Sequence, residues 1–230
     1  MANKGKIAPS QAEANVGEIL SRSERFIETY RNLIITVVAA IIIIVVAILG
    51  ARQYYFLPKE KEAQEAVFPG ENYLMNNQWE LALNGDSLGY IGFLGVIDEY
   101  GITKTAKLAE AYAGICYYHL GKPEEALTHL NKFNVNDKVI SPSITGLIGD
   151  CHVDMGELQE GIKYFNKAAS KAGSELLSPI YLKKSATVYI KLADYKKAIE
   201  IYNTIKNKYP NSVEANDIDK YIDQAAANIK

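Results

Sequence analysis

The hydrophobic pattern divides the chain into one apolar run near its start and a longer stretch of amphipathic segments. Residues 33–51 read LIITVVAAIIIIVVAILGA, without a charge and with Thr36 as the polar side chain. At about 1.5 Å per residue, such a helix matches the roughly 30 Å hydrocarbon thickness of a bilayer. Because the run is apolar on every side, it predicts a transmembrane helix; a core helix of a soluble domain would have a polar stripe.

A cleaved signal peptide is the other interpretation of an apolar run near the N-terminus. It would have a shorter apolar region behind a brief basic leader, whereas about thirty residues of mixed charge precede this one. We therefore interpret 33–51 as a retained anchor in the lipid bilayer. Tyr30 before it and Tyr54, Tyr55 and Phe56 after it are typical of interfacial aromatic belts.

The flanking charges give no orientation for this anchor. Three basic residues lie on each side of it, namely Arg22, Arg25 and Arg31 before it and Arg52, Lys59 and Lys61 after it. The positive-inside rule needs an excess on one side. Topology therefore has to come from another source.

Three later segments repeat one order of small and large residues: AYAGICYYHLGKPEEALTHLNKF, GLIGDCHVDMGELQEGIKYFNKA and KSATVYIKLADYKKAIEIYNTI. The small residues are Gly114, Gly149 and Ala186 in the first predicted helix of each segment, and Ala126, Gly161 and Ala198 in the second. Small residues let two helices of a hairpin approach closely. The spacings of 35 and 37 residues in the second set resemble the 34-residue tetratricopeptide (TPR) pattern.

The predicted fold is all-α: an N-terminal single transmembrane helix followed by a TPR-like helical-hairpin solenoid with a C-terminal capping helix. The leading hairpin is expected to consist of helices over 71–83 and 90–100, and a capping box at Asn211 to Glu214 is expected to begin the last helix. The expected domains are a cytoplasmic tail and juxtamembrane helix (1–32), the transmembrane helix (33–51), a linker helix (52–70), a degenerate leading hairpin (71–106), three TPR-like repeats (107–211) and the capping helix (212–230).

The order of an anchor, ELALNGD, FLGVIDEYG, LAEAYAGICYYHLG and DIDKYI resembles the YfgM-like family of bacterial envelopes, the ancillary SecYEG translocon subunits. The resemblance covers nearly the whole chain. It implies a single-pass protein of the inner (cytoplasmic) membrane, with the tail in the cytoplasm and the repeats in the periplasm. It also implies protein partners, namely the translocon and periplasmic chaperones. A structural factor in envelope assembly or cell division is the alternative function.

Charge and motifs point away from catalysis and from nucleic acid. The 25 basic and 27 acidic residues nearly cancel, and no concentrated basic stretch is visible to neutralise phosphates. The chain has no nucleophile elbow, phosphate loop or zinc-protease motif. We therefore predict a protein that is not an enzyme, with no cofactor, no small-molecule substrate and no nucleic-acid partner.

The two cysteines are the remaining candidates for chemistry. Cys116 lies three residues before His119, and Cys151 precedes His152, so that a metal or redox site is one interpretation. Both cysteines, however, occupy the same small buried position of their repeats, which favours inert core thiols. Equivalent positions in adjacent repeats lie about 8–10 Å apart, too far for a disulfide.

The concave face of the repeats is the predicted partner-binding groove. Its expected lining is Ile115, Tyr118, His119, Asp150, Val153, Asp154, Lys183, Thr187 and Lys191. Such a groove suits a helix or an extended peptide. We expect Tyr118 to be an exposed apolar anchor, and Lys183 and Lys191 to engage an acidic stretch of the partner. The alternative is that partners bind the convex face or the anchor.

Overall fold

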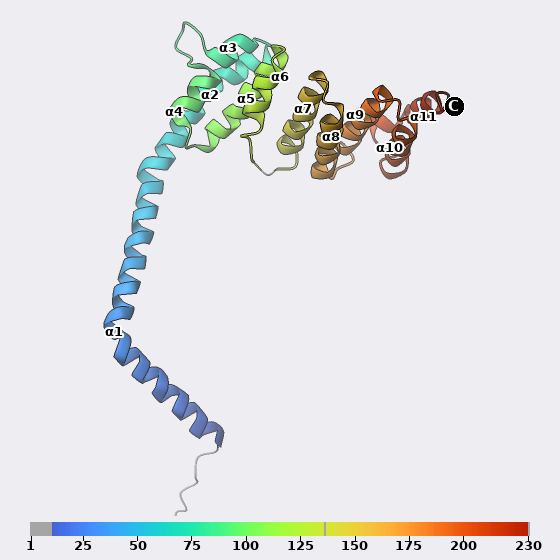
Figure 1. Cartoon of the computed structure of the whole chain (residues 1–230). Helices are drawn as coiled ribbons and strands as arrows, with labels where there is room; N and C mark the ends of the chain where they lie inside the picture. Colours follow the sequence, from blue (N-terminus) through green and yellow to red (C-terminus); the bar gives the residue numbers. More distant parts are fainter. Residues whose placement is uncertain (1–10, 136, 230) are drawn as a thin grey trace, which may run out of the picture. The chain divides into compact units, whose positions relative to one another are not determined.

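The computed structural model describes the backbone of residues 11–135 and 137–229, and side chains from residue 29 onward within these ranges. Throughout the described part, the regular elements are helices (Figure 1), which confirms the all-α prediction. Two compact units divide the chain, residues 1–58 and residues 59–230. The first ten residues of the expected tail lie outside the described ranges.

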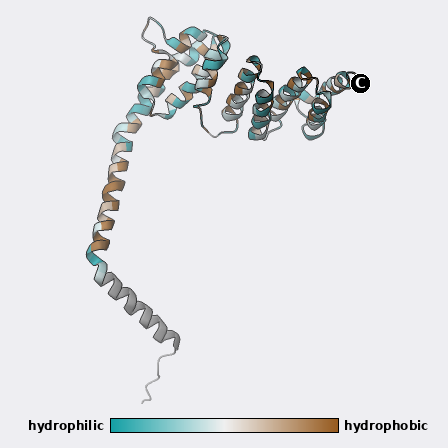
Figure 2. Ribbon diagram, viewed as in Figure 1, coloured by the Kyte–Doolittle hydropathy of each residue, from teal (hydrophilic) through white to brown (hydrophobic). Residues whose placement is uncertain are grey.

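The first unit consists mainly of one long helix. Helix α1 (Gln11–Ala51) continues through a π-helical turn, η1 (Arg52–Phe56), into α2 (Leu57–Met75). Figure 2 shows a continuous hydrophobic band in α1, and every side chain from 29 to 49 is exposed to solvent. Among the described residues, this is the one helix long and apolar enough to cross a membrane.

The leading hairpin differs from its prediction. The structure breaks the expected helix over 71–83 into the end of α2 and a short α3 (Trp79–Asn84). Asn77 between them has a left-handed backbone, with φ of 57°. Asparagine tolerates this conformation better than most residues, which is why the chain turns at this point although the hydrophobic pattern continues. The expected linker and the start of the hairpin therefore share one helix, α2.

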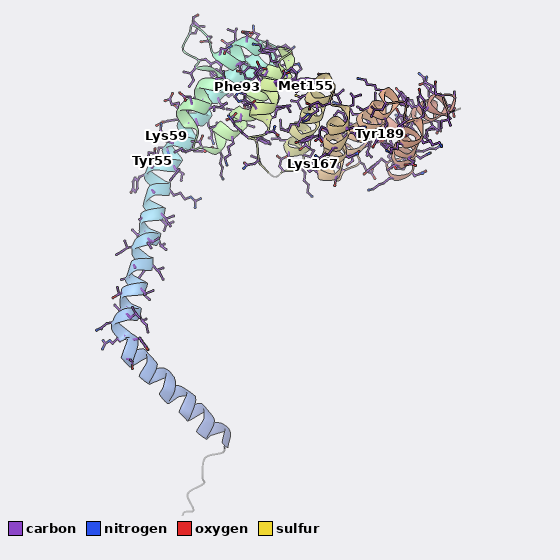
Figure 3. All side chains as sticks on the ribbon, viewed as in Figure 1. Tyr55, Lys59, Phe93, Met155, Lys167 and Tyr189 are labelled. Carbon is purple, nitrogen blue, oxygen red and sulfur yellow. The ribbon has the colours of Figure 1, made fainter. Side chains whose placement is uncertain are left out.

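Helix α4 (Gly92–Tyr100) completes this leading region, whose core surrounds the fully buried Phe93, labelled in Figure 3. The N-terminus of the next helix is held by a side chain of α2. Glu60 accepts hydrogen bonds from the backbone N–H groups of Lys104 (2.8 Å) and Thr105 (3.2 Å) and from the Thr105 hydroxyl (2.8 Å). Free N–H groups at a helix start need such acceptors, and α2 is thereby fixed to the first repeat.

Three antiparallel hairpins follow, each formed by two consecutive helices. Their bounds are α5 (Lys104–His119) with α6 (Pro123–Leu130), α7 (Ile140–Asp154) with α8 (Leu158–Ala172), and α9 (Ser178–Lys191) with α10 (Tyr195–Lys208). The turns within the hairpins contain Gly121, Gly156 and Ala193, all with positive φ. Glycine adopts this backbone without strain, whereas Ala193 does so at a cost.

The small residues are located where the helices of a hairpin approach each other. A Cβ atom added at Gly114 would lie 2.5 Å from Cγ of Leu130 and 3.2 Å from the carbonyl oxygen of Ala126. A Cβ added at Gly149 would lie 2.8 Å from two ring carbons of Phe165 and 3.2 Å from the carbonyl oxygen of Gly161. The carbon–carbon distances are shorter than ordinary contacts. The sequence therefore identified the correct contact positions in these two hairpins.

The end of the repeats is covered by a short 3₁₀ turn, η2 (Val213–Ala215), and by α11 (Ile218–Ala226). The capping side chain is that of Ser212, which accepts from the N–H of Ala215; the cap expected at Asn211 is therefore one residue too early. Ile218 of α11 is buried against Tyr202 and Ile205 of α10. This contact shields the last apolar surface of the repeats, as a solenoid requires.

Candidate functional site

A cleft of about 460 Å³ lies between the second and third hairpins. Six of the nine predicted groove residues line it: Asp150, Val153, Asp154, Lys183, Thr187 and Lys191. They come from α7 and α9, the first helices of adjacent hairpins. The remaining lining residues are Phe165, Ile180, Lys184, Val188 and Glu214.

The two walls of the cleft carry opposite charges. Aspartates project from α7 and lysines from α9, and one pair meets directly, with Lys184 Nζ 2.6 Å from Asp150 Oδ2. Burial raises the pKa of Asp150, while the hydrogen bond and the charge of Lys184 act in the opposite direction. Asp154, one turn further along α7, remains exposed. A ligand in the cleft therefore meets one neutralised ion pair beside an exposed acidic group.

The basic wall is only partly neutralised. Lys183 Nζ lies 3.3 Å from Asp217 Oδ1 and 4.3 Å from the ring centroid of Tyr221, so that its position is fixed by both contacts. Lys191, two turns further along α9, is exposed, and no ion pair of the described residues includes it. Lys191 is thus the cation of this wall that is best placed to meet a carboxylate of a ligand.

The floor of the cleft is apolar. Phe165 and Val188 are 2% and 3% exposed and pack against each other in one buried cluster, with Val153 half-buried beside them. The ammonium group of Lys184 lies 5.6 Å from the ring centroid of Phe165. An apolar floor between charged walls is typical of peptide-binding grooves, because the floor supplies affinity and the walls fix orientation.

A second cleft, of about 610 Å³, begins at Thr187, which lines both clefts. Three tyrosines contribute to it, Tyr195 and Tyr202 from α10 and Tyr221 from α11. Tyrosine side chains combine a large apolar ring with a polar hydroxyl, a combination enriched at binding surfaces. The two clefts together extend the recessed surface from α7 to α11.

The three predicted groove residues of the first hairpin do not line either cleft. Ile115 and Tyr118 pack against the buried cluster around Leu130 and Ile148, and both are half-buried. The ring of His119 stacks on that of Trp79, with centroids 4.1 Å apart. The prediction of a freely exposed Tyr118 is therefore wrong, because the neighbouring α7 covers part of its ring.

The environment of Tyr118 nevertheless connects it to the acidic wall. Burial, the charges of Asp150 and Asp154 and a hydrogen bond to Asp154 raise the pKa of Tyr118 to about 12. The side chain thus bridges α5 and α7 at the edge of the first cleft. Its hydroxyl therefore bonds to Asp154, and its ring is not freely exposed to a partner.

Sequence reasoning missed Lys184 and Phe165 as cleft residues. The repeat pattern assigns Phe165 to the core, and it does belong there, yet one face of its ring also forms the cleft floor. Lys184 is adjacent to the predicted Lys183, and the signal available was its spacing of 34 residues from Asp150, one repeat length. Ile180, in the first turn of α9, and Glu214, in η2, gave no signal, because neither occupies a groove position of the repeat pattern.

The cysteines are buried in the core, and the histidines have side-chain partners. Cys116 and Cys151 are free thiols without exposed surface, and burial raises the pKa of each to about 12. Such thiols are unreactive, as expected for core cysteines. His152 Nδ1 lies 2.6 Å from Glu157 Oε2. In the described part of the chain, no group of three or more His, Cys, Asp or Glu residues could hold a metal ion.

Comparisons with known proteins agree with this geometry. The tetratricopeptide repeat family matches two segments, residues 145–170 and residues 184–212. A TPR repeat-containing protein of Methanocaldococcus jannaschii is 26% identical over 98 residues, which cover 43% of this chain and 17% of that protein. A crystal structure of TPR-like repeats of a putative kinesin light chain from Podospora anserina is 11% identical, with a TM-score of 0.56, over 74% of this chain and 87% of that one. At this identity the structure shows a shared fold alone.

Proposed function

We propose that this TPR repeat protein is a membrane-anchored scaffold of the bacterial cell envelope, which binds protein partners in the cleft between its second and third hairpins. TPR repeats indicate a protein–protein interaction scaffold. The observation that carries the proposal is the cleft itself, where six of the residues expected from the repeat pattern surround an apolar floor. The lining suits a short peptide or helix with a basic group toward Asp154 and an acidic group toward Lys191.

Anchoring in a membrane rests on α1. Its window of highest hydropathy has none of its residues buried within the protein, so that water would have to hydrate a helix that is apolar on all sides. Lipid removes this cost, because a bilayer solvates the side chains and the helix satisfies its own backbone. The repeats would then be held close to a membrane surface.

The partner class follows from the resemblance to the YfgM-like family of ancillary SecYEG translocon subunits. By that resemblance the repeats lie in the periplasm and the partners are the translocon or periplasmic chaperones. The alternative partner class is the envelope-assembly or cell-division machinery, which the same cleft would serve equally well.

Photo-crosslinking from the cleft tests the binding surface and identifies the partner class. A photoreactive amino acid replaces Thr187, which is exposed and lines both clefts. A matched probe replaces Asn166, which is exposed on α8 and lines neither cleft. We expect a discrete crosslinked protein in native membranes from the first position and none from the second.

The crosslink should disappear when Lys191 is replaced by Glu, because the reversed charge would repel an acidic group of the partner. Identification of the captured protein by mass spectrometry then separates translocon and chaperone partners from division factors. Equal crosslinking from Thr187 and Asn166 would contradict a cleft-specific site.

Protease accessibility tests the topology. Protease added outside spheroplasts should digest the repeats and leave the first thirty residues protected. Protection of the repeats would make the protein a cytoplasmic adaptor and would remove periplasmic chaperones from its partners.

A further inference from the structure

The second cleft, of about 610 Å³, differs in chemistry from the first. It is formed by residues of α9, α10 and α11, the last helices of the array (Figure 1), and by two residues that follow α11. Three tyrosines, three uncharged polar residues and three aliphatic residues line it, and none of these described residues is charged. In the first cleft, six of the eleven lining residues are Asp, Glu or Lys. The two clefts therefore suit different ligands.

The bottom of the second cleft is apolar and fixed. Tyr202 and Ala225 are each 2% exposed, and Tyr202 belongs to the buried cluster that also contains Ile205. Ala227 lies at the rim and is exposed. Because alanine has a single methyl group, α11 leaves space at these two positions that a larger residue would fill.

Two half-buried tyrosines, Tyr195 and Tyr221, supply further aromatic surface to this cleft. The ring of Tyr221 lies 5.8 Å from that of Tyr202, with 38° between the ring planes. Lys183 Nζ lies 4.3 Å from the centroid of the Tyr221 ring. Since these contacts hold Tyr221 before a ligand arrives, binding would cost little side-chain entropy.

The cleft also offers hydrogen-bond donors that the fold does not use. In the described part of the chain, the hydroxyls of Tyr195 and Tyr221 and the side-chain amide of Gln224 have no hydrogen-bond partner. Gln224 is exposed, and Asn228 beside it donates to the Gln224 backbone oxygen (2.8 Å). Phenol and amide groups can donate to carbonyl oxygens of a ligand.

A proline-rich segment in the polyproline II conformation matches these features. Its backbone has no internal hydrogen bonds, so that its carbonyl oxygens are available to donors. Its pyrrolidine rings pack on aromatic side chains, which is how proline-rich segments are recognised in aromatic-lined grooves. Neither contact needs a charge. An uncharged cleft that combines tyrosine rings with unused donors therefore favours this class of ligand.

Other modes of peptide recognition use features that this cleft lacks. Strand addition needs the free edge of a sheet, and the regular elements of the described chain are helices. Recognition of a phosphate group needs an arginine cluster, whereas the described lining has no cation. An amphipathic helix would leave the donors unused, because a helix satisfies its own backbone groups.

We propose that the second cleft is a separate binding site for an uncharged, proline-rich segment of a partner protein. The prolines pack against the rings of Tyr195 and Tyr221, and the Gln224 amide donates to the backbone of the segment. The site goes beyond the proposed function, because it does not depend on the charged cleft. Thr187 lines both clefts, so that a partner with a proline-rich segment beside a charged one can occupy both.

Fluorescence polarisation with labelled decaproline tests the site in the full-length chain, purified in detergent micelles. A glycine–serine peptide of equal length and label is the control, because it is flexible and has no pyrrolidine rings. We expect saturable binding of decaproline and much weaker binding of the control, with empty micelles as the blank. Because the lining is uncharged, the affinity should change by less than about twofold between low salt and 1 M salt.

Variants of the lining assign the binding to this cleft. Tyr195→Ala should weaken decaproline binding by roughly tenfold, and Tyr195→Phe by less, because it keeps the ring. Gln224→Ala should weaken it by about threefold, which is the net effect of one hydrogen bond. The matched controls are Tyr164→Ala, at a half-buried tyrosine of α8, and Gln159→Ala, at an exposed glutamine of α8. Both positions lie outside the two clefts, and these variants should bind as the parent does.

Ala227→Leu provides a test that removes no contact. The larger side chain should fill the cleft and weaken decaproline binding, with a circular dichroism spectrum equal to that of the parent. Unchanged affinity in this variant and in Tyr195→Ala would overturn the site.

Lys191→Glu separates this site from the charged cleft, because Lys191 lines the first cleft and not the second. It should leave decaproline binding unchanged; loss of binding in this variant, or strong salt dependence, would place the peptide in the first cleft. No binding of decaproline, or equal affinity for both peptides, also overturns the proposal. An uncharged amphipathic helical peptide that displaces decaproline more effectively than unlabelled decaproline does would make a helix the occupant. None of these outcomes contradicts the charged cleft, which the Lys191-dependent crosslink tests.

Discussion

Replacement of Gly149 by Leu is the sharpest test of how the second hairpin packs. A Cβ atom at this position would lie 2.8 Å from two ring carbons of Phe165 and 3.2 Å from the backbone oxygen of Gly161. Favourable carbon contacts are about 3.5–4.0 Å, so that ring and helix would have to separate by roughly 0.7 Å or more. Phe165 is 2% exposed and cannot swing into solvent, and the Gly161 oxygen moves only with α8.

The expected loss of stability follows from two opposing contributions. Leucine in place of glycine improves helix propensity by up to about 1 kcal/mol. Overpacking a well-filled contact costs typically about 1–3 kcal/mol, and the three further carbons of leucine place this variant at the upper end. Subtracting the first contribution from the second leaves a net loss of about 2 kcal/mol. For a unit of this size that corresponds to a melting temperature lower by roughly 4–8 °C.

Thermal unfolding followed by far-ultraviolet circular dichroism measures this loss. The control is Asn166→Leu, which adds the same side chain at an exposed position of α8 and should unfold close to the parent. Phe165→Leu should relieve part of the clash when combined with Gly149→Ala, giving a double variant less destabilised than the sum of the single changes. A Gly149→Leu protein that melts together with the parent would refute the contact between Gly149 and Phe165, and with it the register of α7 against α8.

Three further predictions concern the rest of the domain. The fragment from Pro58 to Lys230 should be soluble and should show the circular dichroism spectrum of a helical protein; a spectrum dominated by strand would contradict the fold. Replacing Glu60 by Gln should lower the free energy of unfolding at pH 7 by about 1 kcal/mol, as measured by urea unfolding. Burial by itself would raise the pKa of Glu60, but hydrogen bonds from the Thr105 hydroxyl and two backbone N–H groups outweigh it and lower that pKa. The carboxylate therefore stabilises the fold above the ordinary glutamate range and ceases to do so as the pH falls through the lowered pKa, and the variant should lose this part of the acid sensitivity. Tyr118→Ala should lower both partner capture and thermal stability, whereas Tyr118→Phe should retain most of the stability, because it keeps the half-buried ring and removes only the hydroxyl that bonds to Asp154; an alanine variant of unchanged stability would contradict the packing of this ring against α7.

The repeat pattern predicted the contacts between helices better than it predicted the exposed surface. Gly114 and Gly149 were identified from sequence because a missing side chain leaves a periodic signal. Six of the eleven residues that line the cleft between α7 and α9 were likewise anticipated, since equivalent positions of first helices recur. The first hairpin departed from the pattern because of contacts on both of its sides: Trp79 of α3, outside the three repeats, stacks on His119, and α7 covers part of Tyr118.

Sequence by itself determined the helical class, the apolar helix long enough to cross a bilayer, the three hairpins and the small residues at their contacts. These features depend on local periodicity and on side-chain size, and both can be read from neighbouring positions of the sequence. Tertiary structure alone decided that Lys184 pairs with Asp150, that Phe165 forms both core and cleft floor, and that Glu60 holds the start of α5. Such relations join residues tens of positions apart, and they exist only once the helices have packed and fixed which side chains meet.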